Sequence, residues 1–437
     1  MPGGASSTLP DAVGGRRLTA MPIQFPINRR TALQRFGALA VLPLLGAAKR
    51  KPLPVAAIVT EYRNNSHADV IIGKILEGWK QDGGPGPDLT VAAMYTDQVP
   101  KGDMSRALAR KHGFPITKTV EEAITLGTDR VQVAGVLSIG EHGDYPYTPD
   151  TKQHMYPRRR FFDAITATLR KAGKVVPVFN DKHLAYNWKD ARHMVDTARR
   201  MKIPFMAGSS LPVAWRLPAT TLPIGSEVEA AVGIGYGGIE SYGFHALETL
   251  QSLTERRKGG ETGVASVRLA KGEAIWQTQR DGFWTMELLQ AALVAAQIKT
   301  SGAALKKQLT DGTVFYLIEY RDGLKAAVAM VNGIGNQFGA ALKLRGTAKP
   351  FANWYWLQDG KPYGHFAHLL RAIEHMVHTG QPAYPVERTL LTTGILDRVM
   401  HSQMLGGKKL DSPKLAIKYK PADWTFANRD GEFPLPK

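Results

Sequence analysis

The sequence predicts an α/β protein with an N-terminal Rossmann-like, doubly wound parallel sheet, followed by an α+β domain with a large, mostly antiparallel open sheet. In the first half, short apolar runs alternate with segments whose apolar residues recur at helical spacing, which is typical of a parallel sheet with crossover helices. After about residue 215 this alternation ends, and the expected strands are longer and richer in glycine. With 437 residues, 43% of them hydrophobic, the chain can build two domains of ordinary size.

The elements of the first half follow one another in a regular order. Buried strands are expected at 54–62, 88–98, 129–140, 174–180 and 203–210. Helices are expected at 64–81, 105–113, 119–124, 159–173 and 187–202. The first helix is indicated by the spacing of Val70, Ile71 and Ile75, and the short third helix by a capping box of Thr119 and Glu122.

The second half has a different pattern. Long strands are expected at 313–321 and 323–333, few helices intervene, and late helices are expected at 365–380 and 385–407. We therefore divide the chain into a Rossmann-like domain at 51–212 and a C-terminal domain at 213–437. The C-terminal domain would serve substrate binding and oligomerisation, with its last helices packing back on the first domain.

Residues 1–50 read as a twin-arginine export signal with flanking sequence. Arg29 and Arg30 precede a short apolar run at 36–48, which basic residues follow. This run is too short to span a bilayer, so we expect no stable membrane span once the signal is removed. The segment predicts a periplasmic protein, or one exported through the twin-arginine pathway.

The formal net charge is +18, but the basic residues are scattered and no nucleic-acid-binding motif is present, so we expect no nucleic-acid partner. The expected partner is a small molecule that contains a sugar or a phosphate. One tight basic run includes Arg158 and Arg159, which we interpret either as a solvated helix start or as substrate-binding residues for an anion. The chain has no cysteine, which excludes disulfides and thiolate nucleophiles.

Ionisable residues gather at the ends of two expected strands and on one expected helix. Because ligands bind outside the carboxyl ends of the strands in a doubly wound sheet, the strand ends are candidate sites. Carboxylates and imidazoles in such loops could ligate zinc or manganese, or they could form ordinary hydrogen-bonded turns and helix caps. The metal-ligand candidates are Glu141, His142, Asp144, His183 and Glu248.

Several segments together resemble the family of glucose–fructose oxidoreductase, inositol dehydrogenase and rhizopine-type MocA proteins. "VVPVFNDKHLAYNWKDARHMVDTAR" resembles the family's strand with its Glu-Lys-Pro signature, and "GFHALETLQSL" resembles its Gly-x-His-x-x-Asp helix. The resemblance extends over about 53–410 and implies a Rossmann domain, an open-sheet domain, activity on sugars with NAD(P), and a homo-oligomer. It also implies catalytic roles for Lys182 and His245, to which we add Asp181 as the neighbour of the lysine.

The first turn departs from the family pattern. A nicotinamide-binding Rossmann domain has G-x-G-x-x-G after its first strand, whereas this chain has "TEYRNNSHA" at 60–68, without glycine. Glu61 would repel a pyrophosphate unless Arg63 offsets its charge. Asp97, at the end of the second strand, could still bind a ribose hydroxyl. These three residues are the cofactor-binding candidates if a nucleotide binds.

Three functions remain open. The first is an exported hydrolase or lyase that uses a divalent metal or acid–base residues on a glycoside or a phosphoester. The second is an NAD(P)-dependent sugar oxidoreductase with an atypical cofactor loop, and the third is a non-catalytic binding protein. The clustered ionisable residues favour an enzyme, and the missing glycines favour the first function over the second.

Overall fold

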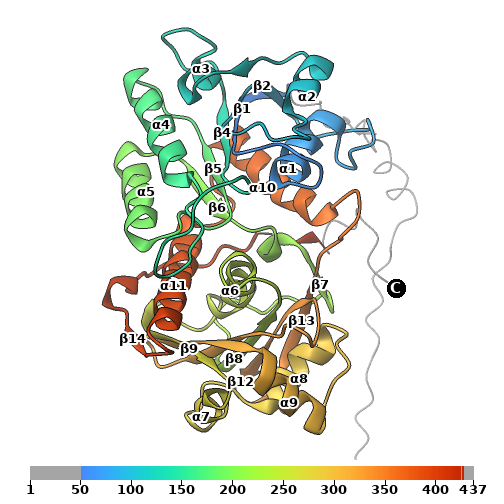
Figure 1. The fold of residues 1–437 in the computed structure, drawn as a ribbon, viewed down its shortest axis with the longest axis vertical. Helices are drawn as coiled ribbons and strands as arrows, with labels where there is room; N and C mark the ends of the chain where they lie inside the picture. Colours follow the sequence, from blue (N-terminus) through green and yellow to red (C-terminus); the bar gives the residue numbers. More distant parts are fainter. Residues whose placement is uncertain (1–50, 425, 428–437) are drawn as a thin grey trace, which may run out of the picture. The chain divides into compact units, whose positions relative to one another are not determined.

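A computed structural model describes residues 51–424, 426 and 427, which belong to one compact unit (Figure 1). The predicted export signal lies outside the described residues. The last strand of the first sheet ends at Gly208, and the first strand of the second sheet begins at Trp215. No helix in the described part of the chain is both long enough and apolar enough to cross a membrane.

The first sheet has six parallel strands in the order β3-β2-β1-β4-β5-β6. They are β1 (Leu53–Val59), β2 (Leu89–Thr96), β3 (Ile116–Thr117), β4 (Gly135–Ile139), β5 (Val178–Asp181) and β6 (Phe205–Gly208). This is the strand order of a Rossmann sheet, and it confirms the predicted fold class of the first half. All the carboxyl ends lie along one edge of the sheet, so the loops after β1, β4 and β5 lie at the same edge.

Helices cover both faces of this sheet. They are α1 (His67–Glu77), α2 (Ser105–His112), α3 (Val120–Thr125), α4 (Arg158–Lys171), α5 (Trp188–Met201) and the late helix α10 (Gly364–Thr379). Because strand side chains alternate between faces, Val55 and Ala57 pack with α1, α2 and α10, whereas Ala56 and Ile58 pack with α3, α4 and α5. Thus α10, although late in the sequence, belongs to the core of the first sheet.

Short polar side chains begin several of these helices. Ser66, Thr119 and Asn187 are N-caps whose side chains accept hydrogen bonds from backbone N–H groups three residues later. The N-cap predicted at Thr119 is confirmed, since Glu122 N–H donates to Thr119 Oγ1 at 3.1 Å. The return contact of the capping box differs from the prediction, because the Glu122 carboxylate accepts from the N–H of Lys118, at 2.9 Å, and not from that of Thr119.

The second sheet has eight strands in the order β14-β9-β10-β11-β8-β12-β13-β7, and only β8 and β11 pair in parallel. The strands are β7 (Trp215–Leu217), β8 (Val228–Gly235), β9 (Val264–Lys271), β10 (Val314–Tyr320), β11 (Lys325–Met330), β12 (Phe338–Leu344), β13 (Phe351–Trp356) and β14 (Leu410–Asp411). The predicted mostly antiparallel open sheet is therefore confirmed.

This half contains more helices than the sequence indicated. α6 (Ser241–Thr254) and α11 (Val386–Met404) pack in the core on one face of the second sheet, and α7 (Ala274–Arg280), α8 (Met286–Ala295) and α9 (Gly302–Gly312) cover the other (Figure 1). α7, α8 and α9 are short, and α8 is apolar on most sides, so their helical periodicity is weak. Thr285 is the N-cap of α8, and its Oγ1 accepts a hydrogen bond from Leu288 N–H at 3.2 Å.

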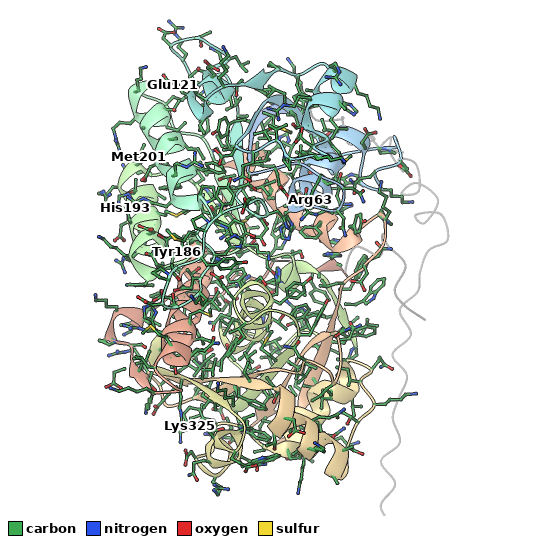
Figure 2. The ribbon with its side chains drawn as sticks, in the orientation of Figure 1. Arg63, Glu121, Tyr186, His193, Met201 and Lys325 are labelled. Carbon is green, nitrogen blue, oxygen red and sulfur yellow. The ribbon has the colours of Figure 1, made fainter. Side chains whose placement is uncertain are left out.

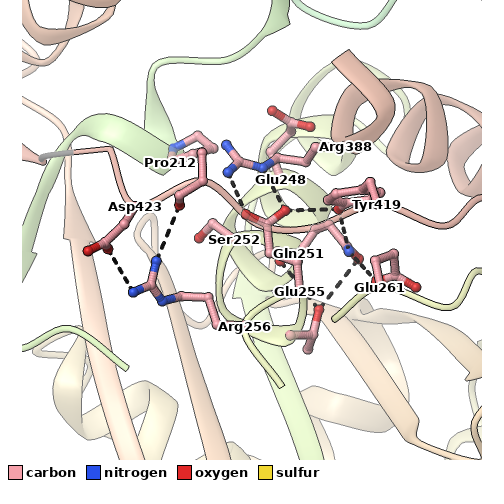
Figure 3. Close-up of polar contacts among 12 residues, drawn as sticks. Pro212, Glu248, Gln251, Ser252, Glu255, Arg256, Glu261, Arg388, Tyr419 and Asp423 are labelled. Atoms are coloured by element: carbon pink, nitrogen blue, oxygen red, sulfur yellow. Dashed lines mark hydrogen bonds and ion pairs between the residues drawn. The ribbon is translucent and has the colours of Figure 1, made fainter. Parts of the chain in front are cut away.

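A buried polar network ties α6 to α11 and to the C-terminal segment (Figure 3). Glu255 accepts hydrogen bonds from Arg388 Nε at 2.9 Å and from the Tyr419 hydroxyl at 2.8 Å. Gln251 Nε2 donates to the Tyr419 oxygen at 2.9 Å and to Glu261 at 2.6 Å. Because buried charges are costly unless paired, this network holds α6, the helix that carries His245, in one position.

Candidate functional site

A cavity of about 370 Å³ lies where the carboxyl ends of the parallel strands meet α6 and α10. Its wall includes residues of the turn after β1, the loops after β4 and β5, and both helices. Arg63, labelled in Figure 2, marks the turn after β1 and contacts His142 of the cavity wall, with 3.2 Å between Nη2 and Nδ1. The cavity is therefore at the place where this fold class binds ligands.

A buried ion triad forms part of the wall. Glu141 follows β4 and is 5% exposed; its carboxylate pairs with Lys182 Nζ at 2.9 Å and with the Arg158 guanidinium. Burial alone would raise the pKa of Glu141, but Lys182 and Arg158 outweigh it and hold this pKa well below its usual value. The carboxylate thus keeps its charge and fixes both cations.

Lys182 is held in an unusual backbone conformation. Its φ is +61°, which is uncommon for a residue other than glycine. Its N–H donates to the Gly208 carbonyl at 3.1 Å, and its Nζ donates to the Ser241 carbonyl at 3.4 Å, at the start of α6. The lysine therefore bridges the edge of the parallel sheet and α6, and its strained backbone is typical of a functional site.

His183 turns away from this cavity. Its Nε2 accepts a hydrogen bond from Arg158 Nη1 at 2.9 Å, and its Nδ1 is buried without a hydrogen-bond partner among the described residues. Burial and the Arg158 charge hold the pKa of His183 well below its usual value. His183 instead borders a second cavity of about 420 Å³, beside Glu240, whose pKa burial raises to about 7.

His245 lies on the α6 side of the first cavity. Its ring centroid is 5.9 Å from that of Tyr242 and 6.0 Å from that of Phe338. Burial, and then the charge of Lys182, hold the pKa of His245 well below its usual value, so the imidazole is neutral at neutral pH. Its Nδ1 is buried without a hydrogen-bond partner among the described residues.

The sequence analysis missed His67. It is the first residue of α1, it lines the cavity, and its Nδ1 lies 2.6 Å from Asp181 Oδ2. His67 lies at the end of the turn after β1, which lacks the glycines of a phosphate-binding loop. A histidine at the carboxyl end of the first strand was the available signal.

The predicted metal centre is wrong. The described residues contain no group of three or more histidines, aspartates and glutamates that could hold a metal ion. Glu141 is paired with Lys182 and Arg158, and Asp144 is exposed, with its N–H bonded to Gln98.

The remaining metal-ligand candidates contact different partners. Glu248 points to α11, where Thr392 Oγ1 donates to it at 2.8 Å, and burial raises the pKa of Glu248 to about 7. His183 is bonded to Arg158, and His142 Nδ1 faces Arg63. The partners of the metal-ligand candidates could not be predicted from neighbouring residues, since most of these partners lie far away along the chain.

The nucleotide-binding candidates are engaged with neighbouring side chains. Glu61, 6% exposed, accepts from Arg63 Nε at 2.6 Å. The Asp97 carboxylate accepts from the hydroxyls of Tyr95 and Tyr145 and from Arg160, each at 2.6 Å. Burial would raise the pKa of Asp97, but these donors lower it below its usual value.

Of the two substrate-binding candidates, Arg158 is buried in the ion triad. Arg159 instead joins α4 to α5, pairing with Asp163 at 2.7 Å and with Asp190 at 2.8 Å. Adjacent arginines on a helix point in different directions, which explains their different surroundings.

The fold is shared with solved proteins that bind NAD. GenD2 from gentamicin A biosynthesis, in complex with NAD, matches with a TM-score of 0.50 at 14% identity over 83% of this chain and 97% of its own. Scyllo-inositol dehydrogenase from Lactobacillus casei, with NAD(H) and scyllo-inositol, matches with a TM-score of 0.50 at 10% identity over 83% and 99%. An NAD-binding oxidoreductase from Klebsiella pneumoniae matches with a TM-score of 0.50 at 14% identity over 82% and 98%. No protein-family model and no curated protein matches the sequence.

The resemblance to the family of inositol dehydrogenase is thus confirmed at the level of the fold. The prediction of a hydrolase or lyase that uses zinc or manganese is corrected, because the solved proteins that share the fold are GenD2 in complex with NAD, a scyllo-inositol dehydrogenase and an NAD-binding oxidoreductase. The missing glycines favoured a hydrolase or lyase in the sequence, but the strand order of the Rossmann sheet is retained without them.

The cavity suits the nicotinamide end of such a cofactor. Its wall carries Lys182 and His245, and three polar atoms of residues in or beside the wall are buried without a partner among the described residues, namely His142 Nε2, Asp181 Oδ1 and His245 Nδ1. Unsatisfied buried polar atoms are uncommon, and a bound polar ligand is one reason for them. At the adenosine end, Arg63 and Asp97 are the residues that would contact the cofactor, after exchanging their present partners.

Proposed function

We propose that the protein is an NAD(P)-dependent oxidoreductase that acts on a hydroxyl group of a small polyol, such as a sugar or a cyclitol. The observation that carries the proposal is the placement of Lys182 and His245 in one cavity at the carboxyl edge of a Rossmann sheet. The fold shared with GenD2 and scyllo-inositol dehydrogenase supports it.

The site residues divide the chemistry among them. When bound, a nicotinamide ring would supply the hydride acceptor for alcohol oxidation. His245 takes the hydroxyl proton, because its imidazole is neutral and therefore able to accept. Lys182, fixed by Glu141 at 2.9 Å, donates to the same oxygen and stabilises the negative charge that develops there. Asp181 acts through His67.

The charges of the cavity favour a neutral substrate. Among the lining residues, Lys182 carries positive charge, and Glu141 and Asp359 carry negative charge. Lys182 is already paired with Glu141, and Arg158 behind it is paired with the same carboxylate. A phosphate would find no unpaired cation here, whereas neutral hydroxyls would find donors and acceptors, so we propose a sugar or cyclitol rather than a phosphoester.

Turnover tests this proposal. The full-length protein is incubated with NAD⁺ or NADP⁺ and scyllo-inositol, myo-inositol or glucose, and NAD(P)H is followed by absorbance. We expect NAD(P)H with at least one polyol, and a loss of about 100-fold or more in kcat for His245→Gln, with NADH binding retained. Absence of turnover with every combination, or unchanged kcat in the variant, contradicts the proposal.

We also propose twin-arginine export and a homo-oligomer. Export is supported by Arg29-Arg30 and the short apolar run after it, and the oligomer by analogy with the resembling family. Cell fractionation of the Arg29→Lys/Arg30→Lys variant tests the first, with cytoplasmic accumulation expected. Light scattering of the purified protein tests the second, and a monomeric mass contradicts it.

A further inference from the structure

His67 and Asp181 form a close pair that crosses the edge of the parallel sheet. His67 begins α1, and Asp181 ends β5, two places away from β1 in the strand order. Their atoms Nδ1 and Oδ2 lie 2.6 Å apart, and their side chains are 13% and 1% exposed. The contact joins residues 114 positions apart, so the fold itself brings them together.

The His67 ring is enclosed by other rings of the cavity. Its centroid lies 5.6 Å from that of His142, 5.1 Å from that of Phe366 and 6.5 Å from that of His245, with the His67 and His245 planes inclined by 28°. Lys182 and Glu141 line the same cavity. Because Nδ1 is taken by Asp181, Nε2 is the nitrogen of His67 that remains for a ligand.

Asp181 has an unused oxygen. Its Oδ1 is buried and has no hydrogen-bond partner among the described residues. A structural carboxylate would usually have both oxygens satisfied, since an unpaired buried polar atom costs about 1–3 kcal/mol. A carboxylate that orients an imidazole and stabilises its protonated form is a recurring arrangement in proton transfer.

We propose that His67 and Asp181 are a proton-transfer pair that serves a second hydroxyl of the bound polyol, beside the hydroxyl served by His245. Asp181 keeps a proton on Nδ1, so the lone pair of Nε2 faces the cavity. The hydroxyl proton moves to Nε2, the O–H bond breaks, and the imidazolium is stabilised by the Asp181 carboxylate. The reverse step returns the proton, and no electrons are exchanged. This role depends on the proposed function in one respect only, namely that a polyol binds in the cavity.

Nitrogen NMR of the full-length protein with ¹⁵N-labelled histidine tests the pair without a cofactor. We expect His67, assigned by loss of its signals in His67→Gln, to carry its proton on Nδ1, and its Nε2 resonance to shift on addition of scyllo-inositol. In Asp181→Asn the amide can donate to Nδ1, so the proton should move to Nε2. A wild-type Nε2–H tautomer, an unchanged tautomer in Asp181→Asn, or the absence of a shift with each of scyllo-inositol, myo-inositol and glucose overturns the proposal.

Measurements of turnover distinguish a failure of the His67–Asp181 pair from a failure of the proposed oxidoreductase function. Where NADH forms, His67→Gln and Asp181→Asn should each lower kcat about 10–100-fold with a smaller effect on KM, and the double variant should lose little more, because the two act as a unit. The control His193→Gln removes a surface histidine 3.3 Å from Asp163, far from the cavity (Figure 2), and should keep its kcat. Wild-type kcat in both pair variants overturns the pair and leaves the oxidoreductase standing. A shift of His67 with scyllo-inositol but no binding of NADH or NADPH overturns the oxidoreductase and leaves the pair.

Discussion

At the scale of single residues, Glu141 determines the electrostatics of the site. Lys182 and Arg158 both pair with its carboxylate, and all three side chains are nearly fully buried. Buried ion pairs add little net stability when complete but are costly when one partner is removed. The sequence identified Glu141 and Arg158 as candidates for different tasks, because it does not show which distant charges meet.

Glu141→Gln should therefore destabilise the protein by about 3–5 kcal/mol at neutral pH, because two buried cations lose their partner. The folded pKa of Glu141 is depressed, so its contribution is present above its unfolded pKa of about 4.3 and is lost as pH falls through the folded value. Denaturant unfolding should thus show a constant difference from wild type at pH 5–7 that shrinks below about pH 4.

The matched control is Glu121→Gln, which breaks an exposed pair with Lys171. Its effect should stay below about 1 kcal/mol. If the free energy of unfolding of Glu141→Gln differs from that of wild type by an equally small amount, or by an amount that grows as pH falls, the account of the triad is contradicted.

At the scale of elements, the loop between β4 and α4 covers the end of β2. Tyr145 from this loop donates to Asp97, and Arg160 from the first turn of α4 does the same. In a Rossmann fold the acidic residue at this place binds the ribose. Here Tyr145 and Arg160 of the chain itself already donate hydrogen bonds to the Asp97 carboxylate.

Tyr145→Phe should strengthen NADH binding several-fold, because one net hydrogen bond of about 1 kcal/mol no longer competes for Asp97. Fluorescence titration measures the Kd. Tyr147→Phe, on the same loop and 59% exposed, is the control and should bind NADH as wild type does. Unchanged or weaker binding in Tyr145→Phe shows that Asp97 does not serve the ribose.

At the scale of the whole molecule, the architecture was readable from the sequence and the site only in part. The parallel sheet followed from alternating apolar runs, but α7, α8 and α9 were missed because short helices give weak periodicity. Lys182 and His245 were found through motif positions. The pairing of His67 with Asp181 could not be found from the sequence, since it depends on how the strands are ordered in space.

The contribution of buried Glu248 to stability should fall as pH rises from about 4.3 to 7, because burial raises its pKa to about 7. Its folded pKa exceeds the unfolded one, so the folded state binds more protons within this window. Glu248→Gln should remove this contribution, so the slope of the unfolding free energy against pH should become more positive by up to about 1.4 kcal/mol per pH unit in denaturant unfolding. The control Glu273→Gln, at an exposed residue, should keep the wild-type slope of the unfolding free energy against pH. The same slope in Glu248→Gln as in wild type contradicts the assignment.

The central claim is that the cavity at Lys182 and His245 holds a nicotinamide cofactor. Titration of the full-length protein with NADH and NADPH, followed by energy transfer from tryptophan, tests it most directly. The account predicts saturable binding of at least one of them, with one site per chain, weakened about tenfold or more in Lys182→Met. The absence of saturable binding by both cofactors, or equal binding in wild type and Lys182→Met, would contradict it.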